Sequence, residues 1–142
     1  MCGIVGYIGN KEATPVMMKG LRRLEYRGYD SAGVAVLQDG NIERVRAIGK
    51  IDNLADEVQK HDLRGTIGIA HTRWATHGAV TEANAHPHVA MDGKLALVHN
   101  GIVENYREIA KNLGLEGKLK SETDSEILAH LIAAHYKGDL RQ

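Results

Sequence analysis

The sequence contains a single cysteine among 142 residues, so it cannot form an internal disulfide, which favours a reducing compartment. It lacks a charge imbalance: lysine plus arginine and aspartate plus glutamate number 18 each, which leaves no net charge to attract a polyanion or a membrane surface. No basic segment precedes the apolar start, and Lys11 and Glu12 end that start too early for a signal peptide or a membrane span. We therefore expect a soluble cytoplasmic protein that binds neither nucleic acid nor membrane.

The length and composition fit one globular domain of mixed strands and helices. Apolar residues make up 43% and charged residues 25%, which is ordinary for a soluble domain. Asp39, Gly40 and Asn41 lie between two apolar runs and predict an antiparallel hairpin. The fold class is therefore predicted as α+β. Strands are expected at residues 2–8, 32–37, 42–48, 66–72 and 94–99.

Four segments have the apolar spacing of amphipathic helices. Pro15 suits the first turn of the first helix, which buries Met17 and Leu21 on one face. Thr123 and Glu126 have the spacing of a capping box at the start of the last helix. The apolar stripe of that last helix is Ile127, Leu128, Leu131 and Ile132. The other two helices are predicted at residues 51–60 and along Ile102, Tyr106, Ile109 and Leu113.

The position of the cysteine suggests a chemical role. If Met1 is removed, the thiol and the free amino group of the chain both belong to Cys2. The amine has a pKa of about 8 and the thiol of about 8.5, so the amine can take the thiol proton near neutral pH. The thiolate would be a nucleophile, and the ammonium could protonate a leaving amine. The alternatives are a small apolar residue inside a strand and a lipidated N-terminus.

Two further segments could serve such a nucleophile. Asn100 and Gly101 follow a predicted strand and offer a side-chain NH2 and a closely approachable backbone N–H to an oxyanion, although Asn-Gly is also a common turn. Arg73 beside Trp74 could bind the carboxylate of an amino acid, and Asp124 could bind its ammonium group. The alternatives are a surface charge at Arg73 and an acid favoured by the helix dipole at Asp124.

Histidines are concentrated in one part of the chain and suggest a rival reading, a metal site. His86 and His88 form an H-x-H pair whose rings would share a face of a strand. Pro87 makes a regular strand doubtful there, and no carboxylate-rich segment lies nearby. We therefore expect no metal and interpret the rings as braces that hydrogen-bond the loop. The five clustered histidines are His71, His77, His86, His88 and His99.

Six segments in order resemble those of the class II glutamine amidotransferases, which are N-terminal-nucleophile hydrolases. The long forms of the second and third are similar in particular to those of the glutamine–fructose-6-phosphate aminotransferase family. Each motif alone would be a weak signal, but six in order, from Met1 to about the last helix, are specific. The segments are MCGIVG, LRRLEYRGYDSAG, HTRWATHG, NAHPH, HNGI and SETDSE.

The resemblance implies a role for each matching residue. Cys2, freed from Met1, would attack the side-chain amide of L-glutamine with its own amine as base. Asn100 and the Gly101 N–H would form the oxyanion hole, while Arg73 would hold the carboxylate and Asp124 the ammonium of glutamine. A thioester would release ammonia and then glutamate, without a cofactor. The remaining implied members are Thr76 and His77 in the pocket, Trp74 in the loop closing over it, and His86 and Arg27 as supports. For Arg27, the residues themselves also allow a simpler reading, a turn with a local ion pair to Asp30.

The resemblance also implies an architecture and partners. The family's glutaminase domain has two stacked antiparallel sheets between helix layers, an αββα sandwich, and exceeds 142 residues. Residues 1–142 are thus expected to be the N-terminal part of such a domain, with unpaired strand edges. In the full-length form, a homodimer, an isomerase part would use the ammonia to convert fructose 6-phosphate into glucosamine 6-phosphate. The alternatives are an inert fragment or binding module, an amidotransferase feeding another acceptor, and a zinc-binding module.

Overall fold

The computed structural model describes residues 1–141 of the chain. None of the helices in this part is long and apolar enough to cross a lipid bilayer. The elements, in order, are β1 (Gly3–Ile8), α1 (Ala13–Leu24), the 3-10 turn η1 (Glu25–Arg27), β2 (Ser31–Gln38), β3 (Asn41–Ile48), α2 (Ile51–Gln59), β4 (Ile67–Arg73), β5 (His88–Ala90), β6 (Leu95–Leu97), α3 (Tyr106–Asn112) and α4 (Asp124–His135).

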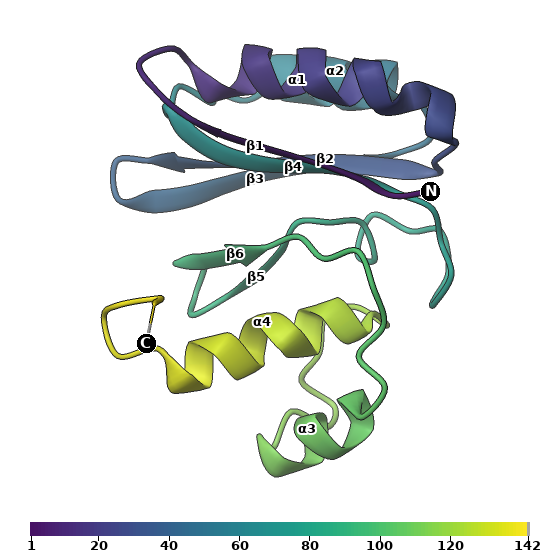
Figure 1. Ribbon diagram of the computed structural model, residues 1–142, viewed down its shortest axis with the longest axis vertical. Coiled ribbons are helices and arrows are strands. Elements are labelled where there is room, and N and C mark those ends of the chain that lie inside the picture. Colours follow the sequence, from purple (N-terminus) through teal and green to yellow (C-terminus); the bar gives the residue numbers. More distant parts are fainter. Residues whose placement is uncertain (142) are drawn as a thin grey trace.

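The elements form four layers (Figure 1). Helices α1 and α2 cover one face of an antiparallel sheet with the strand order β1-β4-β2-β3. The small antiparallel sheet β5-β6 lies below the other face, and α4 and α3 lie beyond it. This helix–sheet–sheet–helix order confirms the predicted α+β sandwich. Strands β1 and β3 are the outer strands of the larger sheet.

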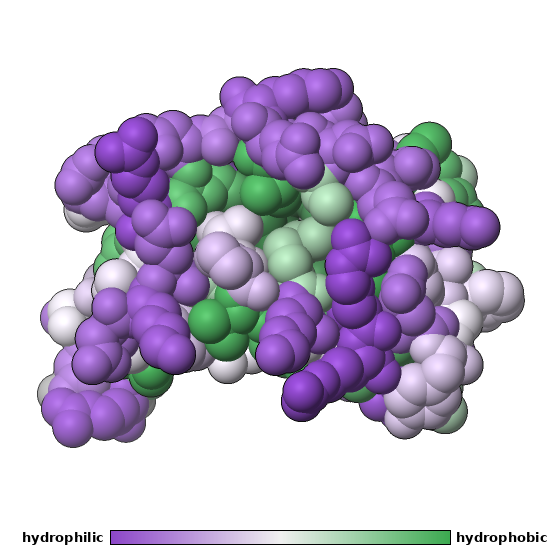
Figure 2. All heavy atoms as spheres, turned by 90° about the horizontal axis from the view of Figure 1, so that it is seen from above, coloured by the Kyte–Doolittle hydropathy of each residue, from purple (hydrophilic) through white to green (hydrophobic). Residues whose placement is uncertain are grey.

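The main core lies between α1, α2 and the larger sheet. Met17 and Leu21 of α1 are fully buried, as the helical spacing predicts, and so are Ile51 and Leu54 of α2. Residues 31–36 of β2 are all buried, because both faces of this central strand are covered. Seen from the side of α1 and α2, polar side chains surround an apolar centre (Figure 2).

The predicted hairpin is confirmed. Asp39 and Gly40 have φ values of 51° and 79° and form a two-residue turn between Gln38 and Asn41, which pair across the strands. Two positive φ values are what a type I′ turn requires, and the Asp-Gly sequence adopts them readily. The turn sets the register in which β2 lies between β3 and β4.

The third helix begins later than the sequence predicts, at Tyr106 rather than near Ile102. Helix α3 starts at Tyr106, and Ile102 lies outside it with 78% of its surface exposed. The backbone before the helix serves another purpose, because the N–H of Val103 donates to the carboxylate of Asp124 at 2.6 Å. A contact with a residue 21 positions away therefore overrides the local helical spacing.

Thr123 is the N-cap residue of α4, as predicted, but the hydrogen bonds of the predicted capping box are absent. The hydroxyl of Thr123 does not cap the helix; it lies 2.8 Å from Nε2 of His88 and 3.0 Å from the hydroxyl of Ser121. Glu126 instead accepts the backbone N–H groups of Lys120 and Ser121, at 2.8 and 2.7 Å. Both side chains therefore hold the segment before α4 in place rather than closing the helix end.

Gly33 in β2 allows the loop that carries His86 to lie directly on the sheet. A Cβ atom at Gly33 would lie 2.1 Å from the carbonyl oxygen of His86. We expect Gly33→Ala to lower the free energy of unfolding by about 2 kcal/mol or more, because the loop must move away. Chemical denaturation measures this change.

Gly6 in β1 is the matched control, since a Cβ there would meet no atom within 4 Å. Gly6→Ala should change the free energy of unfolding by less than about 0.5 kcal/mol. Equal stability of Gly33→Ala and Gly6→Ala would contradict the close approach of the loop.

Candidate active site

All ten residues that the sequence singled out as site members line one cleft of about 630 Å³. The pairing of β1 with β4 places Gly3 opposite Thr72, so Cys2 lies beside the end of β4, where Arg73 and Trp74 follow. The loop after β6 and the start of α4 supply the rest of the wall. The ten residues are Cys2, Arg27, Arg73, Trp74, Thr76, His77, His86, Asn100, Gly101 and Asp124.

Cys2 is partly exposed at the edge of this cleft. Its sulfur accepts the backbone N–H of Trp74 at 3.3 Å and lies 3.8 Å from the carbonyl oxygen of the same residue. The nitrogen of Cys2 is in a peptide bond with Met1, whose own amine donates to the carbonyl oxygens of Arg27 and Gly28 at 2.8 and 3.1 Å. The thiol is thus held in position, while its α-amine is free only once Met1 has left.

Asn100 lies next to Cys2 and has both ends of its amide engaged. Its Nδ2 donates to the carbonyl oxygen of Cys2 at 3.3 Å, and its Oδ1 lies 2.7 Å from Nε2 of His71. At Gly101, a Cβ would lie 2.8 Å from Nε2 of His99, so a side chain would crowd this wall. The geometry brings an amide NH2 group and a glycine into the immediate surroundings of the thiol.

Arg73 is buried at the end of β4, with 4% of its surface exposed. Its guanidinium donates to the carbonyl oxygens of His77 and, at 3.1 Å, of Ala79. These bonds curl the loop after β4 around the charge and use two of the five N–H groups that a guanidinium offers. The others can serve an anion in the cleft. Trp74, 52% exposed, lies at the rim.

Asp124 is the first residue of α4 and is buried, with 8% of its surface exposed. Oδ2 accepts the N–H of Val103 at 2.6 Å, so this carboxylate joins the loop after β6 to the helix. Its other oxygen is a second acceptor on the same wall of the cleft. The carboxylate therefore does more than complement the helix dipole.

Asn84 and Glu122 fasten the loop of Arg73 to the segment before Asp124. Glu122 accepts the N–H of Ala79 at 3.1 Å and the side-chain NH2 of Asn84 at 2.8 Å. Asn84 in turn accepts the backbone N–H of Glu122 at 2.8 Å. The hydrogen bond from Ala79, followed by that from Asn84, lowers the pKa of Glu122 below its ordinary value. The loop that follows Arg73 and the segment that leads into Asp124 are therefore tied together.

Three buried histidine rings lie behind the cleft. The rings of His71 and His86 stack with centroids 4.1 Å apart, and that of His88 meets His86 edge-on at 4.5 Å. His86 accepts the N–H of His99 at 3.4 Å, and His88 bonds Thr123, so these rings do brace the surrounding loops. No group of three histidine, cysteine, aspartate or glutamate side chains suited to a metal occurs within residues 1–141.

Burial keeps the three rings uncharged. It lowers the pKa of His71 to about 4 and that of His88 to about 3, and it lowers the pKa of His86 further. The positive charge of Arg46 acts in the same direction at His88, and protonation of His71 would do so at His86. At neutral pH each ring is therefore a neutral donor and acceptor.

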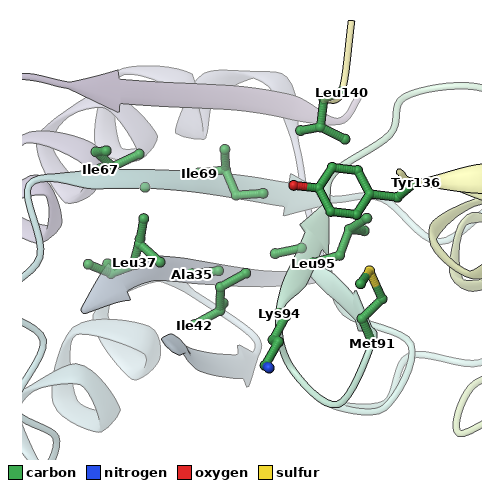
Figure 3. A pocket seen from close by; sticks show the side chains of 13 residues that line it. Ala35, Leu37, Ile42, Ile67, Ile69, Met91, Lys94, Leu95, Tyr136 and Leu140 are labelled. Atoms are coloured by element: carbon green, nitrogen blue, oxygen red, sulfur yellow. The ribbon is translucent and has the colours of Figure 1, made fainter. Parts of the chain in front are cut away.

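A second hollow of about 420 Å³ opens between the two sheets (Figure 3). In this view Ile67 and Leu37 lie at one end and Tyr136 and Leu140 at the other. Its lining is largely apolar, and none of the ten predicted site residues belongs to it. Its only ionisable lining residues are Lys94 and Tyr136, whereas the cleft at Cys2 holds all ten predicted residues, so the chemistry is assigned to that cleft.

Sequence reasoning missed several residues at the cleft. His99 and Ser125 line it and bond each other at 3.1 Å, yet Ser125 was assigned no role and His99 only that of a loop brace. His71, Asn84 and Glu122 act from behind the wall. Their only sequence signal is membership of the six ordered motifs, because their partners are 26 to 38 residues away. Ile102 and Thr123 also line the cleft.

The layered fold and the cleft around a second-residue thiol are those of an N-terminal-nucleophile amidotransferase domain. A family model described as "Glutamine amidotransferase domain" matches residues 46–139, and the chain belongs to this family.

The relatives with curated names indicate which members of the glutamine amidotransferase family this chain is closely similar to in sequence. The chain is 57% identical over 141 residues to a glutamine–fructose-6-phosphate aminotransferase [isomerizing] of Thermus thermophilus, and the match covers 99% of this chain. It is 58% identical over 134 residues, 93% of this chain, to the enzyme of that name from Gluconobacter oxydans. The chain spans 23% and 22% of the length of these two relatives.

Solved structures match the fold. A structure titled as the allosteric regulatory enzyme of purine biosynthesis superposes with a TM-score of 0.80 at 26% identity. The glutamine phosphoribosylpyrophosphate amidotransferase of B. subtilis, complexed with ADP and GMP, superposes with a TM-score of 0.75 at 28% identity. Each match covers 99% of this chain and 31% of the other.

The buried histidines make stability depend on pH. Their folded pKa values lie below the unfolded value of about 6.5, so the unfolded chain binds protons that the folded chain does not. The stability that the three neutral rings contribute above a pH of about 6.5 is lost as the pH falls toward 4. Three such rings give a slope of about 4 kcal/mol per pH unit near pH 5.5, measurable by denaturation at several pH values.

His88→Gln should reduce this slope by about 1.2 kcal/mol per pH unit, since one proton-binding group is removed. His61, an exposed histidine, is the matched control. His61→Gln should leave the slope unchanged, and the account is wrong if both substitutions change it alike.

Proposed function

We propose that this chain is a glutaminase domain in which Cys2 hydrolyses L-glutamine to glutamate and ammonia. One observation carries the proposal: the thiol, the Asn100 amide, Arg73 and Asp124 all line the same cleft, although Cys2 and Asp124 are 122 positions apart in the sequence. These groups are respectively a nucleophile, an oxyanion donor, a cation and an anion. Glutamine needs all four, since it is a zwitterion with a side-chain amide.

The reaction begins with the loss of Met1, which frees the α-amine of Cys2. The amine takes the thiol proton, and the thiolate attacks the side-chain carbonyl carbon of glutamine. Nδ2 of Asn100 and the N–H of Gly101 stabilise the resulting oxyanion. The carbon–nitrogen bond then breaks, the ammonium returns its proton to the leaving nitrogen, and ammonia departs. Water attacks the thioester next and releases glutamate with the thiol restored.

Two oppositely charged residues of the cleft select the substrate. Arg73 holds the α-carboxylate through N–H groups not used by its own loop, and Asp124 holds the α-ammonium. Their opposite charges fix the direction in which glutamine lies, with its amide toward Cys2. Thr76, His77, Trp74, His86 and Arg27 complete the lining, with Trp74 at the rim over the bound amino acid.

The acceptor of the ammonia is proposed from the relatives. Those 57% and 58% identical are named for fructose 6-phosphate, whereas the phosphoribosylpyrophosphate enzyme is 28% identical. We therefore favour fructose 6-phosphate, aminated by a part outside this chain, in a full-length homodimer. Retention of Met1 would instead favour an inert module, because the amine would remain in an amide.

Cys2→Ala tests the nucleophile. We expect release of glutamate from glutamine to fall by a factor of about 10³ or more, because no other group in the cleft replaces the thiolate. An assay of glutamate with intact mass spectrometry of the same sample relates activity to the presence of Met1. The unfolding midpoint should stay nearly unchanged, since the side chain is partly exposed. Equal activity of the variant and the unaltered chain would refute the role of Cys2.

Asp124→Asn tests recognition of the ammonium group. Asparagine keeps an oxygen for the N–H of Val103 but loses the charge, so the KM for glutamine should rise about 10- to 100-fold. Asp92, exposed in the turn between β5 and β6, is the matched control. Asp92→Asn should leave steady-state constants unchanged, and an unaltered KM in Asp124→Asn would exclude the ion pair.

A further inference from the structure

His71 is a fully buried histidine that the proposed mechanism does not use. Its Nε2 lies 2.7 Å from Oδ1 of Asn100, the residue whose NH2 group faces Cys2. We propose that His71 is a positioning residue of the oxyanion hole, which donates from Nε2 to Asn100 and turns the amide NH2 group toward the substrate carbonyl. This inference rests on the proposed glutaminase function and assigns a role to a residue outside the cleft.

An asparagine amide is useful to an oxyanion only in one of two orientations. Rotation by 180° would replace the donating NH2 with a carbonyl oxygen, which repels negative charge. The contact from Asn100 Nδ2 to the carbonyl oxygen of Cys2 is 3.3 Å long and is therefore a weak restraint. The shorter contact to His71 is thus the stronger restraint on the amide.

The surroundings of His71 decide which ring nitrogen carries the proton. Its Nδ1 is buried and has no hydrogen-bond partner within residues 1–141. A proton on Nδ1 would be a buried donor without an acceptor, and Nε2 would then face Oδ1 of Asn100 as a second acceptor. With the proton on Nε2, that nitrogen donates to Oδ1 of Asn100, and Nδ1 is left only as a buried acceptor without a donor. Burial lowers the pKa of the ring to about 4, so this single-proton form persists at neutral pH.

The ring itself is held from two sides. Its backbone lies in β4, between Ile4 of β1 and Gly33 of β2. The ring of His86 stacks on it at 4.1 Å with planes 17° apart. A donor fixed by a central strand and a stacked ring gives the amide a rigid support, which a loop residue such as Asn100 does not have by itself.

Three variants of the full chain test the role through steady-state kinetics. His71→Leu removes the donor, while His71→Gln places an amide N–H close to the position of Nε2. We expect kcat to fall about 10²-fold in His71→Leu with the KM for glutamine within twofold, and most of kcat to return in His71→Gln. His88→Leu is the control, because His88 lies in the same ring cluster but bonds Thr123. It should keep kcat within about threefold.

An unchanged kcat in His71→Leu, an equal fall in His88→Leu, a loss confined to KM, or no recovery in His71→Gln would each overturn the proposal. The unaltered chain provides a second test that needs neither activity nor a stable variant. Long-range proton–nitrogen NMR should show His71 with a proton on Nε2 and none on Nδ1 between pH 8 and pH 6. A proton on Nδ1 would overturn the positioning role. Failure of the unaltered chain to release glutamate would refute the proposed function, whichever nitrogen is protonated.

Discussion

The antiparallel pairing of β1 with β4 is the constraint on which the site depends. Chain ends usually fray, and a nucleophile on the second residue needs a fixed position. Six paired positions from Gly3 opposite Thr72 to Ile8 opposite Ile67 supply it. The hydroxyl of Thr72 also accepts the N–H of Gly3 at 3.0 Å. The same pairing delivers Arg73 and Trp74 to the neighbourhood of Cys2, so one strand contact locates both the nucleophile and part of its substrate wall.

Loops that carry the remaining groups are held by polar contacts rather than by an apolar core. Arg44 of β3 donates to the carbonyl oxygen of Pro87, and Arg46 donates to those of Ala83 and Ala85, each at 3.0 Å. Burial lowers the pKa of Arg46 to about 10, which is still well above neutral pH. The buried cation is therefore charged, and the two carbonyl oxygens accept its hydrogen bonds. These contacts place His86 over Gly33, where it supports the ring of His71.

Local patterns in the sequence predict the fold and the membership of the cleft well. The hairpin at Asp39 and Gly40 and the buried face of α1 follow from short-range rules. The ordered motifs name ten residues that line one cleft, although their assigned roles remain predictions. What the sequence does not predict depends on partners far along the chain. The hydroxyl of Thr123 bonds His88 instead of an N–H group of α4, and Val103 bonds Asp124 instead of entering α3. The spacing of neighbouring residues cannot predict such long-range contacts.

The central claim is that a free N-terminal Cys2 is an activated thiol in a glutamine site. A glutamine analogue with a diazoketone in place of the amide tests it most directly, because only an activated thiol beside a bound amino acid should be alkylated quickly. Mass spectrometry of the digested chain should find one adduct, on peptides that begin at Cys2, and excess glutamine should suppress it. An unlabelled Cys2 in chains that have lost Met1, or labelling that glutamine does not slow, would contradict the account.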